Sequence, residues 1–317
     1  MRSRVGVAIA TLVLGLCVAP AAQAGPLDML YAPLHVHGTS QTQSFIQSHF
    51  PTVSVSAGQL KKGWHSSNTG LYTKGTRSSV ATYPESWYMH TAGGARIHDR
   101  ALKSYFVMNP SSSGWRQQVV QNCAGAPQWC FVDAMGTDGY QRMSAKPTVS
   151  ESQWISETTA EANYVENASS GWSVMANNLI TPNNPIFAVG FEMFARVSAA
   201  QSLQVLEHTR CYCFAKLGTE SGARYGFTLF LSGAGPGDHI SVGTDSQTGK
   251  WWDFYNSAST LGSPTGPATV SGNLIVRQFT NGEVIVNTGG TTTTVVARSG
   301  GPATSVAPHD GKIILNP

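Results

Sequence analysis

Short apolar runs alternate with stretches of helical character along most of this chain, and this alternation constrains the fold more than any other feature. The runs at residues 129–136, 171–179, 185–194 and 211–217 are nearly continuous in apolar residues, which is typical of strands covered on both faces. Repeated strand and helix predict parallel strands with crossover helices. About eight such units in about 235 residues predict an α/β fold, a (β/α)8 TIM-type barrel.

The remaining elements follow from the same pattern. Helices are predicted at residues 40–50, 111–124, 150–169 and 198–210, strands at 33–39, 52–58, 70–75 and 239–243, and either a helix or a strand at 221–235. A doubly wound open sheet is the alternative fold. No GxGxxG motif follows any of the strands, which weakens the nucleotide-binding form of that alternative.

The pattern changes at about residue 262, where β-branched residues alternate with turn dipeptides up to residue 317. Asn281-Gly282 lies between two strand-like runs, and this dipeptide is the strongest short signal for a hairpin. The sequence therefore predicts a barrel over residues 25–261 and a small antiparallel, β-sandwich-like appendage over residues 262–317.

The first 24 residues resemble a bacterial-type signal peptide. Arg2 and Arg4 precede an apolar run, and Ala22 and Ala24 form a small-residue cleavage site. No later stretch has the roughly 20 apolar residues of a membrane helix. We therefore expect a secreted, extracellular protein that has no contact with a membrane once the signal is cleaved.

Charge and cysteine content limit the classes of partner. The net charge of +3 is small and its basic residues are scattered, so nucleic acid is not expected as a partner. Of the five cysteines, Cys17 lies in the signal peptide, and Cys123 and Cys130 flank a short turn-rich loop that a disulfide can close. Cys211 and Cys213 either pair or remain buried thiols. No spacing typical of a zinc site occurs, so no metal and no cofactor is expected.

Two acids follow apolar strands. Asp133 ends the run at residues 129–136 and Glu192 lies in the run at residues 185–194. Side chains at the carboxyl ends of barrel strands line the active site, and two carboxylates from different strands are what glycoside hydrolysis needs. Each acid also has a structural explanation, because Asp133 can cap a turn and Glu192 can pair with Arg196.

Several segments resemble known enzymes, among them "WCFVDAMG" and "GFEMF". The resemblance is to secreted (β/α)8 glycoside hydrolases related to the endo-α-1,4-polygalactosaminidases and to hypothetical glycosidase families, and it spans residues 85–99, 109–120, 129–136, 174–179, 190–194, 261–266, 277–287 and 307–315. In these families an Asp ends the fourth strand and a Glu ends the sixth. The resemblance implies that Asp133 is the nucleophile and Glu192 the general acid/base of a retaining mechanism. Related families often carry a second acid after the Asp, whereas here Ala134 follows.

Other polar and aromatic residues lie where loops of such a barrel meet a substrate. Rings can stack on sugars, and amide, imidazole, carboxylate and ammonium groups can bind hydroxyls; a core or turn role is the alternative for each. The candidates for substrate binding are His37, Trp87, Tyr88, His90, Asp99, Asn177, Asn178, Lys216, Trp251 and Trp252.

Together these features predict a monomeric secreted hydrolase that cleaves the O-glycosidic bonds of an α-linked polysaccharide or oligosaccharide. The alternative is a weak or inactive barrel that binds glycans. A serine hydrolase is disfavoured because the chain has no GxSxG motif.

Overall fold

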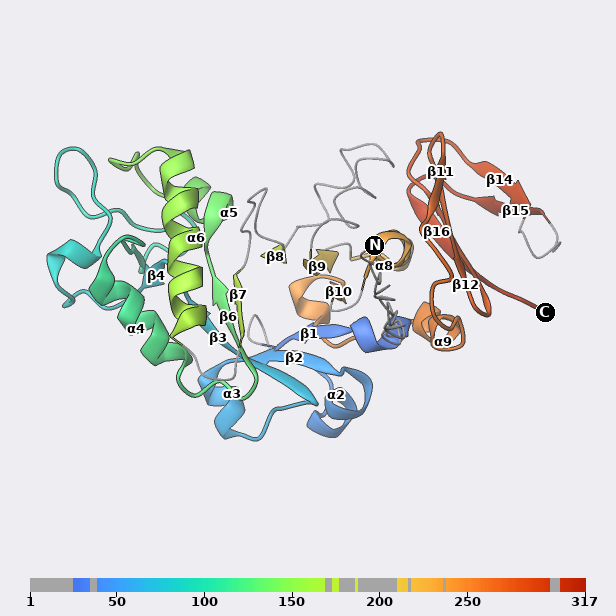
Figure 1. Cartoon of the computed structure of the whole chain (residues 1–317), viewed down its shortest axis with the longest axis horizontal. Helices are drawn as coiled ribbons and strands as arrows, with labels where there is room; N and C mark the ends of the chain where they lie inside the picture. The colour runs from blue at the N-terminus through green and yellow to red at the C-terminus, as the bar shows by residue number, and fades with distance from the viewer. Residues whose placement is uncertain are drawn as a thin grey trace, which may run out of the picture.

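The computed structural model describes residues 25–34, 39–168, 173–176, 186–187, 210–215, 218–235, 238–296 and 303–317. Parallel strands occupy the middle of the molecule. Helices α4 and α6 lie on one side of them, and the antiparallel C-terminal strands lie at the opposite end (Figure 1). The chain is therefore an α/β protein with a separate antiparallel sheet.

The larger parallel sheet has five strands in the order β1-β2-β3-β6-β7. All four strand pairs are parallel, and Lys74 at the end of β3 is in register with Asp133 at the end of β6. The strands are β1 Tyr31–Pro33, β2 Thr52–Val55, β3 Asn68–Lys74, β6 Trp129–Asp133 and β7 Ser173–Ala176. The first strand begins earlier than the predicted range of 33–39, because Tyr31 and Ala32 pair with Thr52 and Val53 of β2.

A second parallel sheet has the order β10-β9-β8. A parallel bridge between Leu30 and Ile240 joins it to the start of β1. Its strands are β8 Ile186–Phe187, β9 Arg210–Ala215 and β10 His239–Val242. Strands predicted at residues 185–194, 211–217 and 239–243 are thus present in the described part of those ranges.

The helices begin at residues whose side chains cap them. The Ser112 hydroxyl accepts a hydrogen bond from the Trp115 amide at α4, the Ser150 hydroxyl from the Gln153 amide at α6, and the Thr219 hydroxyl from the Gly222 amide at α8. The helices are α2 Gln43–His49, α3 Ala57–Lys61, α4 Ser113–Cys123, α5 Gly136–Gln141, α6 Glu151–Asn167, α8 Glu220–Gly233 and α9 Asp253–Ser259, with 3-10 turns at Pro26–Met29, Glu85–Trp87 and Asp245–Gln247. The segment at residues 221–235 is therefore a helix, and the helix predicted at 198–210 lies outside the described residues.

A long excursion separates β3 from α4. It is folded on itself by the antiparallel pair β4 Arg77–Ser78 and β5 Phe106–Val107 and by isolated bridges, among them Tyr88 with Met108 and His90 with Arg96. The buried residues Met89, Ile97 and Val107 share a small core with Trp154 of α6. The stretch that looked irregular in the sequence is therefore packed against the helices beside it.

The C-terminal strands form an antiparallel sheet of order β11-β12-β13-β16 and a two-stranded hairpin, β14-β15. Their bounds are β11 Thr269–Ser271, β12 Leu274–Phe279, β13 Gly282–Asn287, β14 Thr293–Val296, β15 Ala303–Val306 and β16 Asp310–Leu315. Phe279 pairs with Gly282, so the turn of the predicted hairpin is Thr280-Asn281, one residue earlier than the sequence signal. Gly282 belongs to the strand, where it pairs with Leu315 of β16. Glycine is required there because a Cβ would overlap the Ile314 carbonyl.

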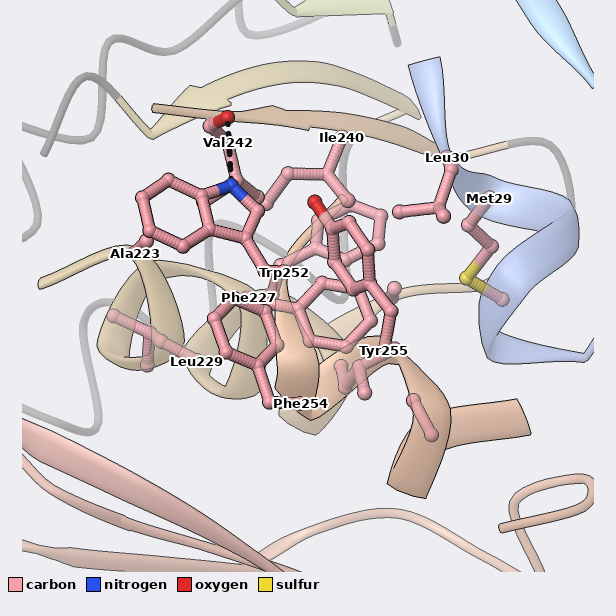
Figure 2. Packing of buried hydrophobic residues seen from close by; sticks show 14 of the residues in the cluster. Met29, Leu30, Ala223, Phe227, Leu229, Ile240, Val242, Trp252, Phe254 and Tyr255 are labelled. Carbon is pink, nitrogen blue, oxygen red and sulfur yellow. Dashed lines mark hydrogen bonds between the residues drawn. The ribbon is translucent and has the colours of Figure 1, made fainter. Parts of the chain in front are cut away.

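Helix α8 packs on this antiparallel sheet, mainly on β13 and β16. A single core cluster includes Phe227 and Phe230 of α8, Ile240 of β10 and Val284 and Val286 of β13. Figure 2 shows the part of this cluster in which the rings of α8 and α9 meet. The C-terminal sheet therefore shares its core with the parallel part of the chain, and the predicted boundary at residue 262 stays a prediction.

The structure contains the predicted disulfide between Cys123 and Cys130, which ties the end of α4 to the start of β6. The side chains of Cys211 and Cys213 lie outside the described set. Within the described ranges, none of the helices has the length and apolarity needed to cross a bilayer.

Candidate functional site

Asp133 is the last residue of β6, the fourth parallel strand along the chain, and its side chain is partly exposed. The Tyr72 hydroxyl of the neighbouring strand β3 donates a hydrogen bond of 2.7 Å to Asp133 Oδ2. The Ala134 amide donates to Asp133 Oδ1 at 2.7 Å. Both carboxylate oxygens are thus oriented by a donor while the group remains open to solvent.

The turn after Asp133 holds this orientation. Ala134 has a φ of 61°, in the left-handed region that residues with a Cβ seldom adopt, and its amide donates to the Asp133 carboxylate. The Gly75 amide donates to the Asp133 carbonyl at 2.9 Å. A Cβ at Gly75 would overlap the side chains of Met135 and Val132, so this close approach of the two strands requires glycine.

An aromatic cluster lies on the same face of the sheet as Asp133. Side chains alternate along a strand, so Phe131 shares this face with Asp133 and Tyr72 shares it with Lys74. Phe131, Trp129 and Tyr31 are almost fully buried and Tyr72 packs against them. A Cβ at Gly70 would overlap the Trp129 ring, so glycine at this position leaves space for the indole. The Asp133 carboxylate therefore lies at the edge of a packed aromatic layer.

Tyr72 was not singled out in the sequence, although its role is specific. Burial raises the pKa of the Tyr72 phenol, and the Asp133 charge together with their hydrogen bond raises it further. The phenol stays protonated and acts as a donor at ordinary pH. The sequence signal that could have found Tyr72 is the alternation of side chains along β3, which puts Tyr72 on the same face of the sheet as Asp133.

Two cations and a second tyrosine adjoin this site. Lys74 Nζ lies 3.4 Å from the centroid of the Tyr105 ring. Arg142 and Tyr105 both lie close enough to Tyr72 to influence its pKa, Arg142 by lowering it and Tyr105 by raising it. Arg142 also forms an ion pair of 3.2 Å with Asp99.

Asp99, a predicted substrate-binding residue, is paired within the protein. Its side chain is fully buried. Asp99 Oδ2 accepts from Arg77 Nε at 2.7 Å, and Oδ1 accepts from the Ala101 and Leu102 amides at 2.8 Å each. Burial alone would raise the pKa of Asp99, but the hydrogen bonds from Arg77 and Leu102 outweigh it and hold the pKa below its usual value. Asp99 therefore anchors the excursion between β3 and α4.

The aromatic residues of that excursion are also structural. Tyr88 is buried, donates to the Val80 carbonyl at 2.8 Å and carries the Arg96 guanidinium over its ring. The Trp87 ring packs against Tyr83 and Trp115. Their recorded contacts within the described ranges are with this core rather than with Asp133, so the structure does not bring them to the site.

His90 lies on the outer surface of the excursion. Its Nε2 is 2.7 Å from Glu85 Oε1, and Arg96 also pairs with Glu85. Hydrogen bonds from Arg96 and then His90 lower the pKa of Glu85 to about 2. This is an exposed ion-pair cluster rather than a subsite beside Asp133.

The adjacent tryptophans differ in environment. Trp252 is buried in the core of Figure 2, where its Nε1 donates to the Val242 carbonyl at 3.4 Å. Its ring is covered by the residues of that core. Trp251 is partly exposed, packs edge-on against His49 and Tyr255, and donates to Asn256 at 3.0 Å. Its contacts do not place it near Asp133.

The remaining predicted residues lie outside the described residues. These are His37, Asn177, Asn178, Glu192 and Lys216. The catalytic pairing of Asp133 with Glu192 therefore stays a prediction. The structure describes the surroundings of Asp133 alone. Among the described residues, no group of three or more His, Cys, Asp or Glu side chains is arranged to hold a metal.

An open groove of about 550 Å³ adjoins the end of α5. Its lining includes Arg100, Tyr140, Lys146 and Glu151. Gln141 and Met143, which flank Arg142 in the chain, also line it. Asp133, Tyr72 and Lys74 are not among its lining residues.

Comparisons with known proteins give structural likenesses only. No family model and no curated protein matches the chain. The glycoside hydrolase domain of PelA from Pseudomonas aeruginosa has 13% identity and a TM-score of 0.40, covering 68% of this chain and 93% of that one. Ega3 from Aspergillus fumigatus, in complex with galactosamine, has 11% identity and a TM-score of 0.40, covering 65% and 89%. The maltogenic α-amylase AmyB from Thermotoga neapolitana has 8% identity and a TM-score of 0.42, covering 78% and 76%. At identities of 8–13% and TM-scores of 0.40–0.42, these likenesses do not assign a function, so any functional argument depends on the residues of the site.

Proposed function

We propose that this chain is a glycoside hydrolase that cleaves O-glycosidic bonds of an α-linked glycan after export and removal of its first 24 residues. The observation that carries the proposal is the Asp133 carboxylate, held by Tyr72 and the Ala134 amide at the carboxyl end of β6. An oriented carboxylate at a strand end, beside aromatic rings, suits attack on a sugar ring.

The proposed fold around this site is a closed (β/α)8 barrel with the C-terminal sheet attached. Eight parallel strands occur in two sheets, the Leu30–Ile240 bridge joins β1 to β10, and β7 and β8 contact each other. These connections support closure of the two sheets into one ring. We therefore propose that Glu192, which follows β8 in the chain, supplies the second carboxylate of this site.

The proposed mechanism uses both acids in two steps. Asp133 attacks the anomeric carbon while Glu192 gives its proton to the departing glycosidic oxygen. Glu192 then takes a proton from a water molecule, and that water displaces Asp133 from the sugar with net retention of configuration. Tyr72 holds Asp133 Oδ2 in the attacking orientation and, as a neutral donor, leaves the negative charge on the carboxylate.

The test is reducing-end release from a panel of α- and β-linked polysaccharides that includes galactosaminogalactan. The protein without residues 1–24 is compared with Asp133→Asn and Glu192→Gln, and folding is checked by melting temperature. We expect activity on an α-linked polymer to fall at least about 1,000-fold in each variant, because loss of a catalytic group removes several kcal/mol of transition-state stabilisation. The anomer formed first, read by NMR, reports whether configuration is retained.

Activity that survives both substitutions would place the catalytic pair elsewhere. Binding of a glycan with no cleavage by the wild type would replace the hydrolase with a glycan-binding protein. Either result separates catalysis from folding only if the variants melt within a few degrees of the wild type.

A further inference from the structure

Lys74 lies beside the candidate nucleophile Asp133 in the parallel sheet. Lys74 of β3 and Asp133 of β6 are in register on neighbouring parallel strands. Tyr72, two residues before Lys74, reaches the Asp133 carboxylate. Because residues two apart on a strand share a face, the Lys74 side chain leaves the backbone on the face that carries Asp133.

The Lys74 ammonium nevertheless does not pair with Asp133. It lies over the Tyr105 ring, 3.4 Å from the centroid, and within the described ranges it has no ion pair with a carboxylate. The side chain is only partly buried. An exposed contact between a cation and a ring contributes about 0.5–1 kcal/mol, so the ammonium can move to a stronger partner at small cost.

A second basic group, Arg142, lies near the same site. Arg142 lies close enough to Tyr72 to influence its phenol. It is therefore a second cation near the Asp133 carboxylate that Tyr72 contacts. Two cations beside one site attract anionic ligands and raise their local concentration.

We infer that Lys74 binds an anionic group, a carboxylate or a sulfate, on the sugar next to the bond that Asp133 attacks, so that the substrate is an acidic glycan. The inference rests on the proposed function, since it names the substrate of the same site. Lysine binds either anion as a compact point charge, and a charge-assisted hydrogen bond is about twice as strong as one to a neutral hydroxyl.

The variants isolate the charge. Lys74→Met keeps an unbranched apolar stem that can rest on Tyr105 and removes the ammonium, whereas Lys74→Arg keeps the charge. Lys62→Met is the matched control, because Lys62 is an exposed residue directly after α3 and its loss changes the net charge equally. Melting temperatures show that each variant is folded.

The substrates form two matched pairs of α-linked polymers. Polygalacturonate is compared with its carboxyl-reduced form, and dextran sulfate with dextran. We expect wild type to prefer the acidic member of one pair. Lys74→Met should lower kcat/KM on that polymer by about 10- to 100-fold, the range for loss of a hydrogen bond to a charged group. Lys74→Arg should recover part of the rate, and Lys62→Met should match wild type. The pair that responds identifies the anion.

A binding experiment decides the inference when no polymer is cleaved. Oligosaccharides from both pairs are titrated by calorimetry into Asp133→Asn and into the double variant Asp133→Asn/Lys74→Met. Binding of an acidic oligosaccharide that weakens about 10-fold or more in the double variant supports the inference even if the hydrolase proposal fails. Wild type that cleaves or binds the neutral member equally well, or a Lys74→Met variant with unchanged discrimination, overturns the inference and leaves the hydrolase proposal standing.

Discussion

Two arginine–aspartate pairs fix two different regions of the molecule. Arg77 and Asp99 join the excursion beside the candidate site, and their side chains are 1% and 0% exposed. Arg224 of α8 and Asp310 of β16 join the C-terminal sheet to the rest of the chain, and their side chains are 28% and 11% exposed. The short contacts are nearly equal, 2.7 and 2.6 Å. Burial therefore separates the two pairs more than geometry does.

The difference teaches what each region depends on. Near the site both charges of the pair are desolvated, so a missing partner leaves a buried charge that water cannot solvate. At the C-terminal sheet, water can solvate either partner, and shared apolar packing carries most of the attachment. An arginine–aspartate pair thus sets the conformation of the excursion, whereas at the C-terminal sheet it adds a smaller contribution to the apolar packing.

The largest effect is expected from removing the two arginines in turn. Arg77→Met should lower the free energy of unfolding by about 3 kcal/mol, the lower end of the range for a broken buried pair, because the buried Asp99 carboxylate keeps only its longer pair with Arg142 and the two amide hydrogen bonds. Arg224→Met should cost about 1 kcal/mol, since its partner stays partly hydrated. Urea unfolding measures both values. Equal costs would contradict the conclusion that burial separates the two pairs.

Packing at the C-terminal sheet gives the next effect. A Cβ at Gly311 would overlap the Thr228 side chain of α8, whereas a Cβ at Gly290 would meet open space. Gly311→Ala should therefore destabilise the protein by about 1–3 kcal/mol, and Gly290→Ala should stay within about 0.5 kcal/mol of wild type. Melting curves of the two variants make the comparison. If both variants lost the same stability, the contact between α8 and β16 would not hold the sheet.

A buried acid with no ion pair among the described residues gives an effect that depends on pH. Glu161 of α6 is fully buried, and burial raises its pKa well above the ordinary 4.5 despite the opposing effects of Arg116 and Trp115. The folded state thus keeps a proton that the unfolded chain releases above about pH 4.5. The associated stability is present below that pH and is lost as the pH rises toward the folded pKa.

Replacing Glu161 with a group that does not titrate tests this dependence. Glu161→Gln should flatten the fall of unfolding free energy that begins as the pH rises above about 4.5. Glu157→Gln, one helical turn earlier, removes a second carboxylate from α6 and is the control. Urea titrations across this pH range measure both, and an unchanged slope in Glu161→Gln would show that Glu161 ionises freely in the folded state.

The sequence predicted much of the secondary structure of the described ranges but less of the site. Helices α4 and α6 have serine caps, and Asp133 ends a strand, so local signals were sufficient there. The segment of α8 is apolar on most of its surface because the C-terminal sheet covers it, and this burial hid the helical period. The burial of Asp99 depends on Arg77, 22 residues away, and Tyr72 reaches Asp133 across 61 residues. Contacts of this range are set by the packing of strands and leave no local pattern.

Ala134 occupies a backbone conformation that glycine would adopt without strain. Its φ of 61° costs about 1 kcal/mol or more for a residue with a Cβ. A glycine here would remove that cost, but it would also widen the range of conformations open to the turn. The direction of the Asp133 carboxylate would then vary with the turn that carries it. Replacement of Ala134 by glycine would therefore remove backbone strain and, in the same step, make the direction of the Asp133 carboxylate less well defined.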